Sequence, residues 1–523
     1  MSVEKNRIKV TQATERSISR LLTWFGLRAV YGLVSKGGWN SMGIRTAEEY
    51  IDSLRDGRKV MFRGKWVDDV TLHPEIRKAI DHASIDFKLS DDPRWKDLFT
   101  YAEDGNIYSV FYKVPSSASD LLQRKRAIEV ATTYGKTIVT LIHEIGSDAI
   151  FALLRIAYLC DRKNGTSYFE RVKQFYELAR DQDLAIAVAQ TDAKGDRDKS
   201  PKEQPFEYHY LKIVKRTNEG IVVRGAKVHT SVSVNSNAII VLPTRAMKDG
   251  ESAYAVSFWL WANSPGLTLV ASPYLSGDRN GNEYPISSKH KMFETVTIFD
   301  DVFVPWEQVF LAGETEFAGL LALAFVDFHR FTAVSYKLPL LDAILGCANL
   351  IARYNGISNA AHVREKIARL IVYVQTVKSL LEAGARAGHM EDPGIFVPDS
   401  VSVNLAKYHF ATNFHTALRD LQDLTGGLLV TYPSPQDFED NIVGELLNKY
   451  LATSYSSAKE RMQLINLISE LTASDLSGYH SVLAVHAEGS IEAEKIAITR
   501  GYDVDKAIAT SLYMAGIQDE PVL

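Results

Sequence analysis

The sequence predicts a mixed α+β protein of several domains, because three successive patterns of hydrophobic residues follow one another. Helical signals dominate up to about residue 188. Alternation typical of strands extends from about Leu184 to Pro305, and helical spacing returns from Ala322 onward. This order favours an N-terminal helical domain, a middle β-barrel domain and a C-terminal helical bundle. We place the domains at residues 42–188, 189–312 and 313–523, after an extension at residues 1–41.

Composition and charge exclude several classes of protein. The chain has 523 residues and a formal net charge of −5, so it lacks the overall basic charge of a nucleic-acid-binding protein. Its two cysteines, Cys160 and Cys347, are far apart and outside any CxxC spacing. This excludes a disulfide scaffold and a cysteine-rich metal site, and it favours a cytoplasmic protein. No apolar run is expected to reach the length of a transmembrane segment.

The N-terminal stretch differs in composition from the rest of the chain. Residues 1–41 carry few acidic groups and form a basic amphipathic pattern, which fits an interfacial helix or a dispensable extension upstream of Met42. They lack the order of a secretory signal. Thr46 and Glu49 then form a capping-box pattern that predicts a helix start.

The helical parts can be assigned in order along the chain. In the first part we expect a hairpin at Val60–Val67 and helices at Ala47–Arg55, Pro74–Ala83, Ser119–Ile156 (two helices broken at Gly146) and Tyr168–Asp181. In the last part we expect long helices near 322–354, 360–388, 402–425, 443–471 and 490–514.

The stretch from Glu219 to Thr244 is the most distinctive part of the β region. A turn signal precedes it, and Gly225 interrupts its β-branched run as at a bulge. Short polar side chains then gather at His229, Thr230, Ser231, Ser233 and Asn235–Asn237. Hydroxyl and amide groups on a strand suit a flat heteroaromatic ligand, although a solvated strand face has the same pattern.

The loop Thr191–Pro201 joins the helical part to the β part. Gly195 allows a tight turn, and Lys194, Asp196 and Arg197 form a compact charged set that could bind a nucleotide. The loop matches neither a P-loop nor a GxGxxG fingerprint. A solvated charged loop remains the alternative.

Several ordered motifs resemble a known flavoprotein family. They are TDAKGDR, GIVVRGAKVHTSVSVNS, FETVTIFDDVFVPWEQVFL, FHR at 328–330, RYNG at 353–356 and TGGLLVTYPSPQDF at 425–438. The chain resembles the family that groups 4-hydroxyphenylacetate 3-monooxygenases with 4-hydroxybutyryl-CoA dehydratases, from Gly43 to the C-terminus, and is closer to the dehydratases. The resemblance implies an acyl-CoA-dehydrogenase-like fold, a homotetramer or homodimer, and FAD held between the β domain and the bundle.

The resemblance also implies the residues that contact the flavin. They fall on Gln190, Thr191, Asp196 and Arg197 of the loop, on His229, Thr230 and Ser231 of the strand, and on Thr425, Gly426 and Gly427. The last three would approach the adenine or pyrophosphate end, from this subunit or from a neighbouring one. A helix C-cap is their alternative role.

The chain departs from both branches of the family at the reaction centre. The dehydratases hold a [4Fe–4S] cluster with three cysteines and a histidine, where this chain has Thr140, Glu144, Tyr336 and His329. Oxygen groups cannot replace three thiolates, so we expect neither a cluster nor another metal. The phenol hydroxylases place arginine, tyrosine and histidine where this chain has Thr140, Glu144 and Val188. Their phenolate clamp is therefore missing too.

Five residues remain as predicted catalytic groups: His329, Glu144, Lys337, Tyr336 and Glu294. His329 and Tyr336 share one helix face, so His329 could act as a base while Lys337 stabilises negative charge. A structural histidine with a snorkelling lysine is the alternative. Glu144 lies in an apolar stretch beside His143 and, if buried, must pair or have a raised pKa.

The predicted function is that of an FAD-dependent oxidoreductase. We expect the oxygenase component of a two-component monooxygenase, in which a partner flavin reductase supplies FADH2 and a small organic molecule is the substrate. One alternative is a cluster-free acyl-CoA dehydratase, isomerase or dehydrogenase. The other is a flavin-binding protein without catalytic activity.

Overall fold

The computed structural model of the chain describes residues 43–521. The predicted extension at residues 1–41 lies outside the described residues. The first described part contains α2 (Ala47–Ser53), β1 (Val60–Phe62), β2 (Lys65–Val67), α3 (Pro74–Ala83), α4 (Ile85–Asp91), α5 (Lys96–Phe99), β3 (Thr100–Glu103), β4 (Asn106–Ser109), α6 (Ala118–Tyr134), α7 (Glu144–Asn164) and α8 (Tyr168–Asp181). The capping box of Thr46 and Glu49 is present, which confirms the predicted start of α2. The hairpin and the bounds of α3 and α8 are confirmed as well.

The predicted helix break at Gly146 is wrong. The break lies instead between Tyr134 and Glu144, where Lys136, Thr137 and Leu141 have positive φ values of 49°, 78° and 62°. Gly146 is inside α7 and serves close packing, because a Cβ there would lie 2.5 Å from Cβ of Ile186. A glycine therefore lets α7 approach the neighbouring strand.

The middle part is built from two sheets. Its strands are β5 (Ile186–Ala189), β6 (Lys212–Arg216), β7 (Gly220–Ser231), β8 (Ala238–Val241), β9 (Val256–Trp261), β10 (Leu267–Ala271), β11 (Glu294–Pro305) and β12 (Val309–Ala312). One sheet has the order β2-β1-β10-β11-β7-β6 and the other the order β12-β9-β8-β5. β5 contacts β7 and β9 contacts β11, so the sheets pack against each other. The strands thus form two hydrogen-bonded sheets that pack against each other, whereas a single barrel was predicted from the sequence.

Two details of the sheets bear on the sequence predictions. The hairpin β1–β2 joins the six-stranded sheet, and the predicted domain boundary at residue 188 falls inside β5. Gly225 has a φ of 145° and lies beside a register shift between β7 and β11. A Cβ there would lie 2.6 Å from Cα of Leu211, which explains the glycine in this strand.

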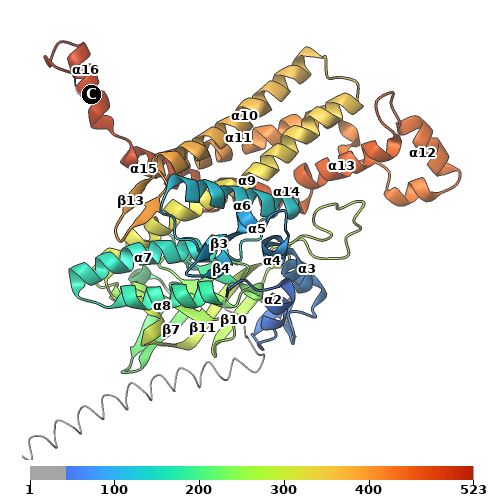
Figure 1. Cartoon of the computed structure of the whole chain (residues 1–523). Coiled ribbons are helices and arrows are strands. Elements are labelled where there is room, and N and C mark those ends of the chain that lie inside the picture. Colours follow the sequence, from blue (N-terminus) through green and yellow to red (C-terminus); the bar gives the residue numbers. More distant parts are fainter. Residues whose placement is uncertain (1–42, 522–523) are drawn as a thin grey trace, which may run out of the picture. The chain divides into compact units, whose positions relative to one another are not determined.

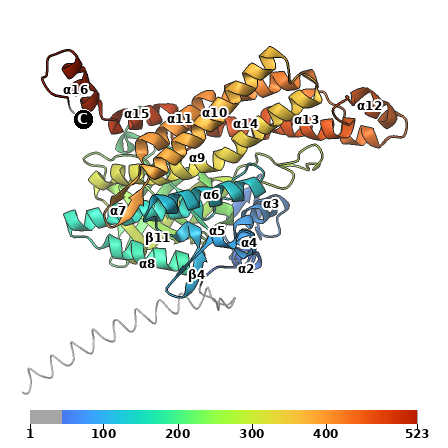
Figure 2. The ribbon, with the colours of Figure 1, turned by 45° about the horizontal axis from the view of Figure 1, so that its top comes forward.

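The last part is helical, with one small hairpin. It contains α9 (Thr315–Tyr354), α10 (Ala361–Arg386), β13 (His389–Glu391), β14 (Ile395–Val397), α11 (Ser400–Thr425), α12 (Val443–Leu451), α13 (Ala458–Thr472), α14 (Asp475–His486), α15 (Ile491–Gly501) and α16 (Val504–Met514). The long helices α9, α10 and α11 lie side by side (Figure 1 and Figure 2). α9 also packs on α6 and α7, which joins the first part of the chain to the last.

Two of the predicted C-terminal helices need correction, and one helix was missed. The segment 443–471 is two helices, because Ser457 and Glu460 form a new capping box at the start of α13. The segment 490–514 is also two, because Asp503 caps α16. α14 was not predicted, although Ser474 caps its first turn.

Helix α9 is long and apolar enough to cross a membrane by length and composition, which was not expected of any segment from the sequence. However, 72% of its most apolar window is buried inside the protein. This burial is that of a core helix, and α9 supplies one wall of the candidate active site.

Candidate active site

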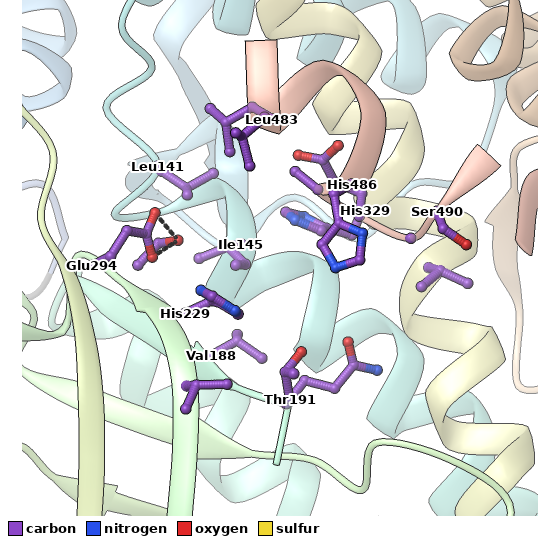
Figure 3. A pocket seen from close by; sticks show the side chains of 18 of the residues that line it. Leu141, Ile145, Val188, Thr191, His229, Glu294, His329, Leu483, His486 and Ser490 are labelled. Atoms are coloured by element: carbon purple, nitrogen blue, oxygen red, sulfur yellow. Dashed lines mark hydrogen bonds between the residues drawn. The ribbon is translucent and has the colours of Figure 1, made fainter. Parts of the chain in front are cut away.

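A cavity of about 1480 Å³ lies where the loop before α7, the strands β7 and β11, and the helices α9, α14 and α15 meet. Leu141, Ile145, Val188 and Leu483 give it apolar walls, and His229, Glu294 and His329 are polar groups within it (Figure 3). Most small-molecule sites have volumes of about 300–1,000 Å³. This cavity therefore has room for a dinucleotide cofactor together with a substrate.

Most of the predicted flavin contacts line this cavity. Gln190, Thr191, Arg197, His229 and Ser231 all do so. His229 has a φ of 57°, which is uncommon for a residue other than glycine, and its side chain is directed into the cavity (Figure 3). Burial lowers the pKa of this imidazole, and His486 and Lys194 add to the effect.

Three cations line the same cavity from two neighbouring loops: Lys194, Arg197 and Arg245. We call them the cationic loop group. Among residues 43–521 their side chains form no salt bridge or hydrogen bond, although Asp192 lies near enough to Lys194 to affect its pKa. Three cationic side chains that form no ion pair with the described residues suit the binding of a pyrophosphate. This donor set therefore fits FAD.

The other predicted flavin contacts lie elsewhere. Asp196 is exposed and pairs with Lys199 at 2.6 Å, and Thr230 is fully buried, so neither lines the cavity. Thr425, Gly426 and Gly427 are outside the cavity of this chain, where Gly426, with a φ of 78°, caps α11. The predicted contribution of these three residues to a neighbouring subunit's site stays a prediction.

His329 is fixed by a buried carboxylate. Its Nδ1 lies 3.1 Å from Oδ2 of Asp148, and its ring stacks on Phe325 with centroids 4.9 Å apart. Asp148 also accepts hydrogen bonds from Arg124 at 2.7 Å and from Thr332 at 3.0 Å. A carboxylate at Nδ1 assigns the proton to that nitrogen, which leaves Nε2 as an acceptor. The residue is thus positioned to accept a proton from a molecule in the cavity.

Tyr336 and Lys337 line the cavity next to a carboxylate that was not singled out from the sequence. Tyr336 donates a hydrogen bond to Glu488, and Nζ of Lys337 lies 2.8 Å from Oε2 of Glu488. Burial raises the pKa of the Glu488 carboxyl, but Lys337 and Lys407 outweigh burial and hold it at about 2. Burial lowers the pKa of Lys337 to about 8 against the opposing charge of Glu488. The charge of Lys337 is therefore already paired, contrary to its predicted role toward a substrate.

Glu294 opens β11 and also lines the cavity. Ser231, its cross-strand partner, donates to both carboxylate oxygens at 3.0 and 2.9 Å (Figure 3). Tyr479 of α14 donates to Oε1 at 2.9 Å. Burial raises the pKa of Glu294 to about 7, although these two hydrogen bonds oppose the rise. A carboxyl with this pKa can exchange a proton near neutral pH.

Glu144 lies behind the cavity wall, although its neighbours Leu141 and Ile145 line it. Its side chain is fully buried and accepts a hydrogen bond from Thr140 at 3.0 Å. Burial raises the pKa of the Glu144 carboxyl to about 8, and the charge of Asp86 adds to the rise. The expected burial and pKa shift are thus present. Glu144 was also predicted as a catalytic group, but it does not line the cavity, and its hydrogen-bond partner Thr140, in the loop before α7, does not line it either.

His143 is also buried away from the cavity. Its Nδ1 lies 3.1 Å from Asp86 and its Nε2 lies 3.2 Å from Asp183. Burial alone would lower the pKa of this imidazole, but the two carboxylates outweigh it and raise the pKa to about 10. His143 is therefore a charged structural residue.

Four residues of the site were not predicted from the sequence: Asp148, Arg245, Tyr479 and Glu488. Asp148 had a signal, since a carboxylate among the apolar residues of a helix requires a partner. Tyr479 and Glu488 had none, because α14 and the turn after it were not predicted.

The residues present do not fit an iron–sulfur cluster. In the described part of the chain, no group of three or more histidine, cysteine, aspartate or glutamate residues could hold a metal ion. At the four compared positions, Thr140 and Glu144 are hydrogen-bonded to each other, while Tyr336 and His329 are engaged with Glu488 and Asp148. No reaction step is therefore assigned to a cluster.

Sequence profiles relate the chain to known proteins. The 4-hydroxyphenylacetate 3-hydroxylase N-terminal profile matches residues 46–311, and the C-terminal profile of the same name matches residues 318–516. The chain belongs to the 4-hydroxyphenylacetate 3-hydroxylase family. Within this family, it is 30% identical to the 4-hydroxybutyryl-CoA dehydratase/vinylacetyl-CoA-Delta-isomerase of Clostridium aminobutyricum, over 91% of this chain and 100% of that protein.

Two further relatives carry the monooxygenase name. The 4-hydroxyphenylacetate 3-monooxygenase oxygenase component of Thermus thermophilus is 30% identical over 83% of this chain and 89% of its own length. A crystal structure of an oxygenase component of 4-hydroxyphenylacetate 3-monooxygenase complexed with FAD superposes with a TM-score of 0.83, at 27% identity, over 91% of this chain and 100% of that chain. These findings confirm the family resemblance, the mixed α+β class and the expectation of an oxidoreductase enzyme.

Proposed function

We propose that this chain is the oxygenase component of a two-component, flavin-dependent monooxygenase acting on a small organic molecule. The observation that carries the proposal is a single cavity that combines the cationic loop group with a carboxylate-held histidine. The oxygenase name of the Thermus thermophilus relative supports the same reading. An acyl-CoA-dehydrogenase-like arrangement of a helical, a β and a second helical domain remains part of the proposal.

The residues that would hold FAD are those already placed around the cavity. Arg197 and its two cationic neighbours would pair with the pyrophosphate, while Gln190, Thr191 and Ser231 offer short polar contacts to the rest of the cofactor. Bound reduced flavin would supply the activation of dioxygen. Apolar residues such as Leu141 and Ile145 would keep water away from the reacting groups.

His329 would be the proton acceptor of the site. With Nδ1 committed to Asp148, its Nε2 can accept the proton of a substrate hydroxyl as that oxygen becomes electron-rich. The Asp148 carboxylate then stabilises the imidazolium that forms. Tyr336 and Lys337 would shape this end of the cavity through their shared contact with Glu488.

A cluster-free enzyme acting on an acyl thioester is the second candidate function. It is favoured by the similarity to the dehydratase, which extends over 100% of that protein. Such an enzyme would convert 4-hydroxybutyryl-CoA without oxygen, so the two functions can be separated by one pair of assays. A flavin-binding protein without catalysis would be negative in both.

The proposal also includes a homo-oligomer, a transient contact with a flavin reductase and a cytoplasmic location. Exposed apolar side chains on α12 (Leu446 and Tyr450) and on α16 (Ile508 and Met514) support self-association. Free, buried Cys160 and Cys347 are compatible with a reducing compartment.

The function is tested by supplying the purified protein with FADH2 from a separate flavin reductase, ¹⁸O₂ and a panel of para-substituted phenols. Mass spectrometry should detect one ¹⁸O atom in a product. A parallel anaerobic reaction with oxidised FAD and 4-hydroxybutyryl-CoA tests the second candidate. Conversion in that reaction alone would reject the monooxygenase proposal.

A further inference from the structure

Four carboxylates line the cavity, and one of them differs from the rest. Asp192 pairs with Lys227, Asp475 with Arg279, and Glu488 with Lys337. Glu294 has no ion pair with any cation in the described part of the chain, and its side-chain partners are the neutral hydroxyls of Ser231 and Tyr479. Glu294 is partly buried, and a carboxylate withdrawn from water is normally matched by a cation or a metal. The charge that would balance Glu294 is therefore not supplied by residues 43–521.

The orientation of Glu294 is nevertheless fixed from two sides. Ser231 holds it from β7 and Tyr479 holds it from α14, so its carboxyl group is fixed between the sheet and the C-terminal helices. These three contacts come from two hydroxyl donors, and an ionised carboxylate offers about four acceptor sites. Capacity for a further donor remains, on a group that already faces the cavity.

An aromatic pair adjoins this carboxyl group. The rings of Tyr274 and Tyr479 stack with centroids 4.6 Å apart and planes 23° apart, and both residues line the cavity. Nζ of Lys291, which pairs with Glu75, already lies 5.7 Å from the centroid of the Tyr274 ring. Aromatic faces attract ammonium groups, and a carboxylate beside aromatic rings is a common way to bind an amine. An anion in the same place would meet the charges of Glu294 and Glu488, and Glu488 is near enough to raise the pKa of Glu294.

We propose that Glu294, together with the Tyr274–Tyr479 stack, is a subsite for the ammonium group of an amine substrate. The proposal names the substrate class of the cavity and rests on the proposed function, in which this cavity binds the substrate. The amine subsite can be distinguished from a role of Glu294 as a general acid. An ammonium group binds the ionised carboxylate, whereas a general acid must carry a proton on its carboxyl group before it can donate it.

Three probes test the subsite on the FAD-loaded protein by isothermal titration calorimetry: tyramine, 4-hydroxyphenylethanol and 4-hydroxyphenylacetate. They share a para-hydroxyphenyl ring and end in an ammonium, a hydroxyl and a carboxylate group. At pH 8 tyramine should bind about tenfold more tightly than 4-hydroxyphenylethanol, as expected for one charge-assisted hydrogen bond. 4-Hydroxyphenylacetate should bind most weakly.

The pH dependence gives a test that needs no variant. The pKa of Glu294 is about 7, so the ionised fraction, and with it the affinity for tyramine, should rise about tenfold between pH 6 and pH 8. The affinity for 4-hydroxyphenylethanol should change little. A tyramine affinity that is flat or falls over this range would overturn the proposal.

Glu294→Gln should reduce the preference for tyramine over 4-hydroxyphenylethanol to within about twofold, since the amide keeps the shape and removes the charge. Glu307→Gln, at an exposed glutamate outside the cavity, is the matched control and should keep the full preference. A preference that survives in Glu294→Gln, or equal binding of tyramine and 4-hydroxyphenylacetate by the unmodified protein, would reject the subsite.

The test also separates this inference from the proposed function. Binding is measured without turnover, so loss of oxygenation activity leaves the result intact. If oxygenation is observed but the three probes bind alike, the amine subsite fails while the monooxygenase stands. If Glu294→Gln loses FAD instead of the amine preference, the carboxyl group serves the cofactor and the inference is wrong.

Discussion

Removing the guanidinium of Arg197 should weaken FAD binding without harming the fold. Arg197 is exposed at the cavity and forms no salt bridge or hydrogen bond with the described residues, so Arg197→Ala leaves no internal partner unpaired. A charge-assisted hydrogen bond contributes about 1.5–3 kcal/mol, which corresponds to an increase of about 10- to 150-fold in the Kd of FAD. Because the attraction is partly exposed, the increase should be smaller at high salt.

Fluorescence titration of FAD into the apoprotein at low and at high ionic strength measures this effect. Arg386→Ala removes another exposed arginine, at the end of α10 and outside the cavity, and is the matched control. Equal thermal stability of both variants would show that the fold is intact. A Kd for FAD unchanged by Arg197→Ala would place the loop outside the cofactor site and refute its role.

Four further predictions concern the site. His329→Gln should lower turnover by about 10²–10⁴-fold and leave the FAD content unchanged, because it removes a base and not a cofactor contact; normal turnover would exclude the base role. Glu144→Gln should keep turnover within about threefold, since Glu144 lies behind the cavity wall, and a loss near that of His329→Gln would contradict this placement. Iron and acid-labile sulfide should be absent from protein purified without oxygen, and stoichiometric iron with sulfide would reject the cluster-free site. The stability of Glu144→Gln relative to the unmodified protein should also depend on pH. The folded pKa of Glu144 is about 8 and its ordinary value is 4.5, so stability from the neutral carboxyl is present below about 4.5 and is lost as pH rises through 8. The melting temperature of the unmodified protein should therefore fall relative to that of Glu144→Gln between pH 5 and pH 9, and a constant difference would show that Glu144 is not held neutral.

Local signals predicted much of the fold. The capping box of Thr46 and Glu49 and the proline at the start of α3 depend on neighbouring residues, so the sequence alone sufficed for them. Gly146 was misread for the opposite reason. Its role is the approach of α7 to Ile186, a contact between residues 40 positions apart, and no local pattern distinguishes such a glycine from a helix stop.

The sequence predicted the site residues that belong to the family motifs, but it did not predict the side chains that bind to those residues. Arg197, His229 and His329 lie on motifs and line the cavity as expected. The partners that set the chemistry, such as Asp148 beside His329 and Glu488 beside Lys337, come from elements distant in sequence. Pairing across a fold depends on packing, so the paired charge of Lys337 could not be anticipated from helix spacing.

The most direct test of the proposed monooxygenase mixes protein loaded with chemically reduced FAD with oxygenated buffer in a stopped-flow instrument and follows flavin absorbance. Protein that binds reduced FAD and controls its reaction with oxygen should give two phases, the first dependent on oxygen concentration and the second independent of it. A matched sample with free reduced FAD gives the reference rate. A single phase at the rate of free reduced FAD, together with conversion of 4-hydroxybutyryl-CoA in the absence of oxygen, would contradict the proposed function.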